Sequence, residues 1–227
     1  MFKRWTGIEA AAAGEPQRVV VLWTDCHADP DGHGSGHADA AYVSRMNILE
    51  VRRHSLTKRD RGGSQLSQEG VDLARRLGES MGPFARVVTT VSPRARETAI
   101  AMGFAVDFEI VTLAMDPEVY ADARNSPFWG IQGERFFGEL SDLVGRDGAL
   151  GRFAHSLAAL WRDVLTPLRD GENALVISHS GDIESSLVTC FPRAEHTSWG
   201  RAFGPCEGAR LAFDDHFTEV ELIRLEA

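Results

Sequence analysis

The stretch that decides the fold is "NILEVRRHS", residues 47–55, in which a short apolar segment runs directly into positive charge. Residues 47–51 have the composition of a buried strand. In open α/β sheets, ligands bind beyond the carboxyl ends of the strands. The Arg and His side chains that follow the segment are therefore candidates for a binding site.

Downstream of this stretch, predicted strands alternate with predicted helices. Such alternation favours an α/β fold, a three-layer sandwich in which a mostly parallel central sheet has helices on both faces. The most regular helix pattern spans residues 149–168, and Ser67 is a candidate N-cap. The other predicted strands are 86–91, 108–113, 173–179, 209–213 and 218–225, and the other predicted helices are 67–81, 95–103 and 182–191.

Composition excludes several classes of protein. A chain of 227 residues, 43% of them hydrophobic, is long enough for one substantial core. A net charge of −9 disfavours nucleic acid and anionic membranes as partners. No run approaches the roughly 20 apolar residues of a membrane span. The widely spaced Cys26, Cys190 and Cys206 form no CxxC pair, so a reducing, cytoplasmic location is expected.

The first part of the chain differs from the rest. Residues 1–45 are predicted to be a partly flexible N-terminal extension, and residues 46–227 a single catalytic domain. Within the extension, His33 and His37 would share a face only on a helix, which the intervening glycines disfavour. A flexible segment is therefore favoured over a metal site there. The side chains considered as metal ligands are His27, Asp29, Asp31, His33, His37 and Asp39.

Charged residues follow three of the predicted strands. Arg53 and His54 come after the first strand, Arg94 after the second, and His179 after the strand at 173–178. The carboxyl ends of parallel strands share one sheet edge, so these side chains should converge. Arginine binds phosphate oxygens in bidentate fashion, and a neutral histidine can act as a nucleophile. The sequence thus predicts a phosphoryl pocket.

At these residues the sequence resembles the histidine phosphatase superfamily, the phosphoglycerate-mutase-like phosphatases. The Arg-His-Gly signature of that family is matched in two of three positions by "RHS", residues 53–55, and "LSQEG", residues 66–70, follows in family-like fashion. The Arg-Ala-x-x-Thr-Ala signature is matched fully by "RARETA", residues 94–99. The strand ending in Ser-His-Gly is matched by "SH" at residues 178–179. The resemblance covers residues 46–227 and implies a phosphoglycerate-mutase-like fold.

The resemblance implies a phosphatase that hydrolyses phosphate monoesters. His54 would attack phosphorus and become phosphohistidine, while Arg53, Arg94 and His179 hold the equatorial oxygens. No metal or other cofactor is implied, because Arg and His can supply the donors. The expected partner is a small phosphorylated substrate or a phosphopeptide, and the oligomeric state is not predicted.

Protonation of the leaving group requires an acid, and the resemblance is weak at this point. Many relatives place a glutamate after the third strand, which makes Glu118 the best-placed candidate, although a solvated loop residue is an equal alternative. Asp182 is a lesser candidate. Arg59 or Arg61 is expected to add a phosphate contact. Arg52 and Lys58 are expected to be solvated.

Two serines stand where the family usually has glycine. Ser55 and Ser180 would either crowd the pocket or add a donor to the substrate. A phosphoryl-binding module without turnover and a phosphomutase of the same fold are therefore alternatives. Segments typical of phosphoglycerate mutases are absent from the sequence, which favours a hydrolase. For the aromatic residues between 114 and 148, core packing is favoured over lining the pocket; these residues are Phe128, Trp129, Phe136 and Phe137.

Overall fold

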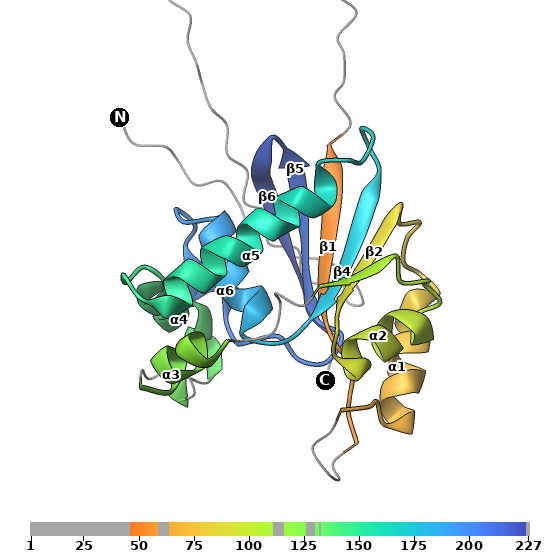
Figure 1. Cartoon of the computed structure of the whole chain (residues 1–227), viewed down its shortest axis with the longest axis horizontal. Helices are drawn as coiled ribbons and strands as arrows, with labels where there is room; N and C mark the ends of the chain where they lie inside the picture. The colour runs from red at the N-terminus through yellow and green to blue at the C-terminus, as the bar shows by residue number, and fades with distance from the viewer. Residues whose placement is uncertain (1–45, 59–63, 111–115, 126–129, 132, 226–227) are drawn as a thin grey trace, which may run out of the picture.

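The protein is built around one mixed sheet of six strands, with the order β3-β2-β4-β1-β5-β6 (Figure 1). The computed structural model describes residues 46–58, 64–110, 116–125, 130–131 and 133–225. The strands are β1 (Asn47–Arg53), β2 (Arg86–Thr90), β3 (Phe108–Ile110), β4 (Asn173–Ser178), β5 (Gly208–Asp214) and β6 (His216–Ile223). All six lie where the sequence predicts strands, with ends that differ by a few residues.

Strand pairing brings the sequence motifs together. β4 pairs in parallel with both β1 and β2, and β2 pairs in parallel with β3. β5 and β6 complete the sheet as an antiparallel hairpin beside β1. In the β1–β4 register Arg53 lies opposite Ser178, so the residues after both strands leave the sheet at one edge. The prediction of a mostly parallel α/β sheet is confirmed.

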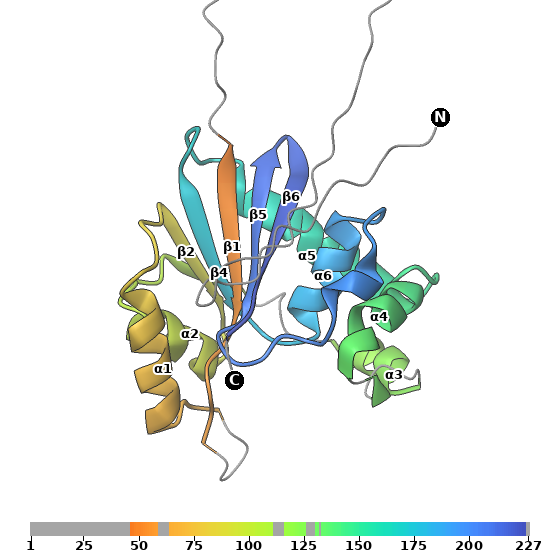
Figure 2. The same cartoon turned by 180° about the vertical axis from the view of Figure 1, so that it is seen from behind.

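Helices cover both faces of this sheet. α5 and α6 pack on one face and α1 and α2 on the other (Figures 1 and 2). The Ser67 side chain accepts a hydrogen bond from the N–H of Gly70, which confirms the predicted N-cap of α1. The helices are α1 (Gln68–Gly78), α2 (Pro93–Ala101), α3 (Pro117–Asn125), α4 (Phe136–Val144), α5 (Ala149–Leu165) and α6 (Asp182–Cys190), with short 3-10 turns η3 (Gly133–Arg135) and η4 (His196–Trp199).

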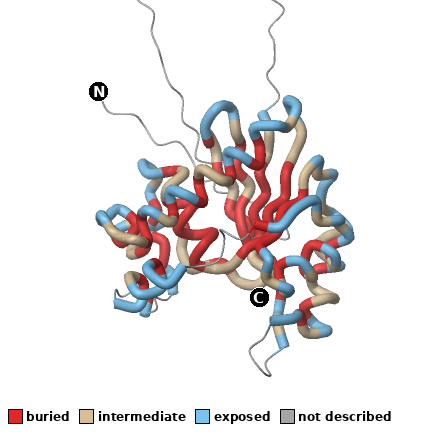
Figure 3. Tube along the Cα trace, viewed as in Figure 1, coloured by how far each residue is buried: buried red, intermediate tan, exposed pale blue. Residues whose placement is uncertain are grey.

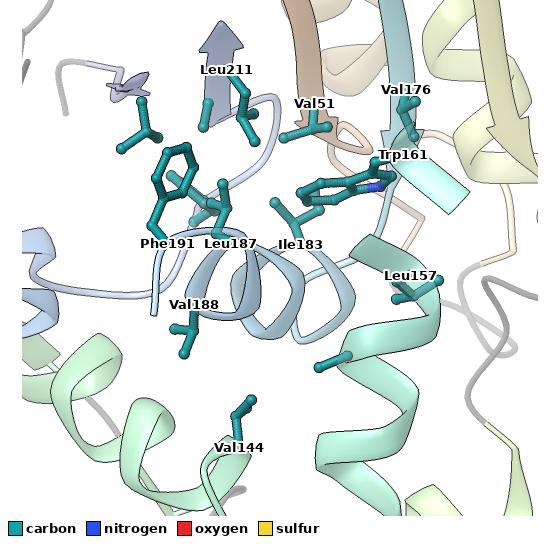
Figure 4. Close-up of a cluster of buried hydrophobic side chains, with 14 of the residues drawn as sticks. Val51, Val144, Leu157, Trp161, Val176, Ile183, Leu187, Val188, Phe191 and Leu211 are labelled. Carbon is teal, nitrogen blue, oxygen red and sulfur yellow. The ribbon is translucent and has the colours of Figure 1, made fainter. Parts of the chain in front are cut away.

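The central strand β4 is buried on both faces because its side chains alternate between two cores. Val176 points toward α5 and α6, beside Trp161 and into the same core as Ile183 (Figure 4). Leu175 and Ile177 point the other way, into the smaller core between the sheet and helices α1 and α2. Figure 3 shows that the buried part of the chain runs through the strands of the sheet. None of the described helices is long and apolar enough to cross a membrane.

Arg52 is a buried residue, and the prediction that it is solvated is wrong. Its side chain is only 4% exposed, its Nε donates to Glu50 at 2.6 Å, and its Nη1 donates to the Cys206 carbonyl at 2.9 Å. Arg210 donates to the second oxygen of Glu50 at 2.7 Å. The reason is that β1 continues to Arg53, two residues beyond the predicted strand, so that Arg52 pairs with β5 inside the sheet.

Gly208 is expected to be essential for the β1–β5 pairing. A Cβ at this position would lie 1.8 Å from the Val51 carbonyl oxygen, and β1 cannot move away because β4 pairs with its other edge. Gly208→Ala should lower the free energy of unfolding, measured by urea denaturation, by about 3 kcal/mol. The control Gly130→Ala, where a Cβ meets no atom of the described residues within 4 Å, should change it by less than about 0.5 kcal/mol. Equal effects of the two would contradict this packing.

Candidate active site

A cavity of about 340 Å³ lies where β1, β2 and β4 end, at the lower edge of the sheet in Figure 1. Four of the residues that line it are the basic side chains predicted to converge. Two apolar side chains and the turn after β4 complete the wall. The lining residues are Arg53, His54, Arg94, Ile131, Phe136, His179, Ser180 and Gly181.

His54 is held with one ring nitrogen free for chemistry. Its backbone N–H donates to the Ser178 carbonyl at 2.9 Å, which continues the β1–β4 pairing by one residue. Its Nδ1 lies 2.8 Å from the Ser55 carbonyl oxygen. A carbonyl only accepts, so Nδ1 carries the proton, and in the neutral ring Nε2 keeps its lone pair. The geometry thus assigns nucleophilic capacity to Nε2.

The environment keeps His54 neutral. Burial lowers its pKa to about 4, and the positive charges of Arg94 and Arg53 act in the same direction. The hydrogen bond to the Ser55 carbonyl opposes the shift but does not cancel it. At physiological pH the ring is therefore an uncharged imidazole, the form in which a histidine can attack an electrophile.

His179 faces His54 across the cavity, with ring centroids 5.2 Å apart. The Arg94 Nε–H donates to its Nδ1 at 3.4 Å, so Nε2 carries the proton and donates to the Thr90 hydroxyl at 3.0 Å. Burial, reinforced by the charge of Arg94, lowers its pKa to about 3. Thr90, at the end of β2, fixes the tilt of this ring. Sequence analysis missed Thr90, although its signal is a polar residue that ends a buried strand.

Arg53 is a partly buried cation with an unused donor. Its Nη1 donates to the Phe203 carbonyl at 2.5 Å, whereas its buried Nε has no hydrogen-bond partner in the described part of the chain. Burial lowers its pKa, and the carboxylates of Glu184 and Glu207 oppose that shift. A buried donor without an acceptor is unfavourable.

A single hydroxyl connects the first two motifs. The Thr98 Oγ1 accepts from the Ser55 N–H at 2.9 Å and donates to the Arg94 carbonyl at 2.7 Å. The Ser55 hydroxyl is turned away and donates to the Gly70 carbonyl at 2.7 Å. Ser55, predicted to bind substrate, is buried and does not line the cavity. Its peptide positions the His54 loop instead.

Of the other residues predicted to contact substrate or act as acid, some line the cavity and others do not. Ser180 lines the cavity, and its hydroxyl donates to Glu184 at 3.0 Å. Glu118 is exposed in the first turn of α3 and does not line the cavity; a helix forms there where a loop was expected, and an acidic residue is favourable in its first turn. Lys58 is exposed as expected. Arg59 and Arg61 lie outside the described residues.

The aromatic residues divide between core and cavity. Phe137 is fully buried and packs on Trp199 and Phe203, which confirms core packing for this residue. Phe136 is also largely buried, yet it lines the cavity together with Ile131. Phe128, Trp129 and the histidine-rich segment at residues 24–39 lie outside the described residues.

Asp182, the lesser acid candidate, is buried beside the cavity without lining it. The Ser178 hydroxyl donates to its Oδ2 at 3.2 Å. Burial raises its pKa to about 8, with the charge of Glu184 acting in the same direction. At neutral pH the carboxyl group is therefore mostly protonated. Its place at the start of α6 leaves it behind the turn that carries His179.

Comparison with known proteins supports the fold. No protein-family model and no curated protein matches the sequence. Among solved structures, a phosphoserine phosphatase from Entamoeba histolytica in complex with 3-phosphoglyceric acid aligns with TM-score 0.58 and 15% identity, over 80% of this chain and 98% of that chain. YhfR of Bacillus stearothermophilus aligns at 0.52 and 16%, over 75% and 94%. A phosphoglycerate mutase from Bacillus anthracis aligns at 0.51 and 15%, over 80% and 93%.

At these sequence identities, the alignments show that the fold is shared. The chain therefore has a phosphoglycerate-mutase-like fold, as the resemblance of its three motifs implies. The aligned proteins include a phosphatase and a mutase.

Replacing Asp182 should stabilise the protein at alkaline pH. A carboxyl group whose pKa rises from 3.8 to about 8 on folding binds its proton more tightly in the folded state. The stability it contributes is present at low pH and is lost as the pH rises through that window. Asp182→Asn, neutral at every pH, should therefore be more stable than wild type by at least about 1 kcal/mol at pH 8. The two should converge near pH 4 in thermal unfolding; a constant difference would contradict the raised pKa.

Proposed function

We propose that this protein is a phosphatase that hydrolyses phosphate monoesters through a phosphohistidine intermediate on His54. The observation that supports this most directly is the convergence of two neutral imidazoles, 5.2 Å apart, with two guanidinium groups in one cavity. The phosphatase and the mutase among proteins of the same fold support phosphoryl chemistry at this sheet edge. The substrate is a small phosphorylated molecule or a phosphopeptide.

In the first step, the lone pair on His54 Nε2 attacks phosphorus in line with the departing oxygen. A neutral ring is required, and the lowered pKa of His54 supplies it over the whole physiological range. The bond from phosphorus to the leaving oxygen breaks as the bond to nitrogen forms, and an alkyl leaving group takes its proton from water in the cavity. The backbone hydrogen bond from Nδ1 to Ser55 stabilises the positive charge that the ring acquires.

Charge on the transferred phosphoryl group is balanced by the other three side chains. Arg53 and Arg94, which both line the cavity, donate to the equatorial oxygens. A monoester that binds as its monoanion passes its proton to His179 Nδ1, and the bound anion favours this charged ring, whose Nδ1–H then donates to the phosphoryl group. Water then attacks the phosphohistidine, which releases inorganic phosphate and regenerates His54.

Glu118 has no part in this scheme, because it faces solvent on α3. Arg and His donors are sufficient for the phosphoryl oxygens, so the proposed reaction proceeds without a metal ion. Aryl phosphates are suitable probes, because a phenolate departs without prior protonation and therefore reports on His54 alone.

Removing the imidazole of His54 should abolish turnover. His54→Ala is expected to lower kcat for p-nitrophenyl phosphate by at least about a thousandfold, the scale seen for lost nucleophiles. Rapid quenching with labelled substrate should trap acid-labile phosphohistidine in the wild type and none in the variant. Full activity is expected with chelator present. The control is His155→Ala, an exposed histidine on α5, which should behave as wild type. An active His54→Ala variant, or a wild type that binds phosphate without forming the covalent intermediate, would contradict the mechanism.

The acid limb of the pH profile should lie unusually low. Because His54 attacks only as the neutral ring, kcat/KM should fall where the ring becomes protonated, and burial lowers that pKa to about 4. We therefore expect kcat/KM for an aryl phosphate to stay near its maximum at pH 5.5 and to decline only toward pH 4. Circular dichroism at each pH is the control that the protein stays folded. A limb centred at pH 6 to 7 would mean that His54 is solvated.

A further inference from the structure

A carboxylate behind the cavity, Glu184 of α6, connects separate parts of the phosphoryl site. Its side chain is completely buried. Oε2 accepts from the Gly181 N–H at 2.5 Å. Oε1 accepts from the Ser180 hydroxyl at 3.0 Å and from the Phe203 N–H at 2.8 Å. All three donors are neutral, so no cation cancels the charge through these contacts.

The three donors belong to two segments that are separate in sequence. Ser180 and Gly181 line it and follow His179 directly. Phe203, more than twenty residues away in sequence, presents its carbonyl to Arg53 Nη1 at 2.5 Å. Glu184 therefore holds the turn after His179 and the backbone that anchors Arg53 in a fixed relation. Glu184 is the third residue of α6, and its bond to the N–H of Gly181 also caps the helix.

The charge of Glu184 acts on Arg53 as well. Burial makes the Arg53 guanidinium less favourable, and Glu184 is the first of the anions that oppose this effect. The carboxylate does not line the cavity, so it does not repel an incoming phosphate at contact distance. A buried anion in this place steadies the cation while leaving the cavity itself positive.

We propose that Glu184 is a positioning residue for the phosphoryl site, which fixes Arg53 and the Ser180–Gly181 turn in the arrangement that receives the anion. This inference rests on the proposed function and deepens it. A group that serves only folding would change stability alone. A positioning group also changes the affinity of the folded protein for the phosphoryl oxygens.

Glu184→Gln in the full chain tests this. The amide keeps the size of the side chain but leaves one accepting oxygen for three donors and removes the charge. We expect the Kd for inorganic phosphate, measured by titration calorimetry well below the unfolding temperature, to rise about tenfold, the scale of a lost hydrogen bond to a charged group. kcat/KM for p-nitrophenyl phosphate should fall by a similar factor.

The matched control is Glu50→Gln, which alters another buried carboxylate with arginine partners outside the cavity. It should lower the unfolding temperature and leave the phosphate Kd within about twofold of wild type, because distant sites act independently. Glu184→Gln behaving in the same way would overturn the proposal. The calorimetric readout is independent of turnover: if the wild type binds phosphate and hydrolyses nothing, the proposed function fails while the Kd comparison still decides the role of Glu184.

If Glu184→Gln does not fold, Ser180→Ala replaces it. This change removes one donor to the carboxylate and leaves Glu184 in place. We expect the phosphate Kd to rise about threefold, in line with the loss of a single neutral-donor contact to a charged group. An unchanged or tighter Kd would overturn the proposal.

Discussion

The burial of two imidazoles beside two guanidinium groups is the constraint on which the site depends. Arg53, Arg94, His54 and His179 share one partly buried cavity, and each arginine makes protonation of the imidazoles less favourable. The fold accepts this arrangement because the rings remain neutral when the cavity holds no anion. An arriving phosphoryl group is attracted by the two arginines, so the same cations that disfavour a charged imidazole favour the binding of an anion.

The anions that balance these cations lie behind the cavity wall. Glu207 accepts from both Arg201 nitrogens at 2.6 Å and from the N–H groups of Gly204 and Leu225. Burial alone would raise its pKa, but these hydrogen bonds and the charge of Arg201 lower it to about 2. The carboxylate therefore stays ionised. The backbone carbonyl of Glu207 accepts a hydrogen bond from the backbone N–H of Arg53 at 2.8 Å. The chain after β6 thus takes part in holding β1 at the site.

The sequence was sufficient to predict which strands carry the site residues at their ends, because each motif follows a strand whose apolar pattern is clear. It could not predict contacts that depend on tertiary geometry. Thr90 and Glu184 belong to elements that were predicted, yet their partners are remote in sequence. α4 was missed although its apolar residues recur at helical spacing, since its aromatic pair was considered only as wall or core. Arg52 was misplaced by a strand end that differs by two residues.

The two serines that replace glycine illustrate how a motif can change while its geometry survives. Glycine matters where the backbone needs positive φ or where no Cβ fits. At the third motif the positive φ, +90°, belongs to Gly181, the residue after Ser180. The Ser180 hydroxyl proton is directed to Glu184, and the Ser55 hydroxyl to the Gly70 carbonyl. Neither hydroxyl donates its proton into the cavity, so the substitutions preserve a site whose donors are the guanidinium and imidazole groups. The turn after His179 therefore needs no glycine at position 180, because the residue with positive φ in this chain is Gly181.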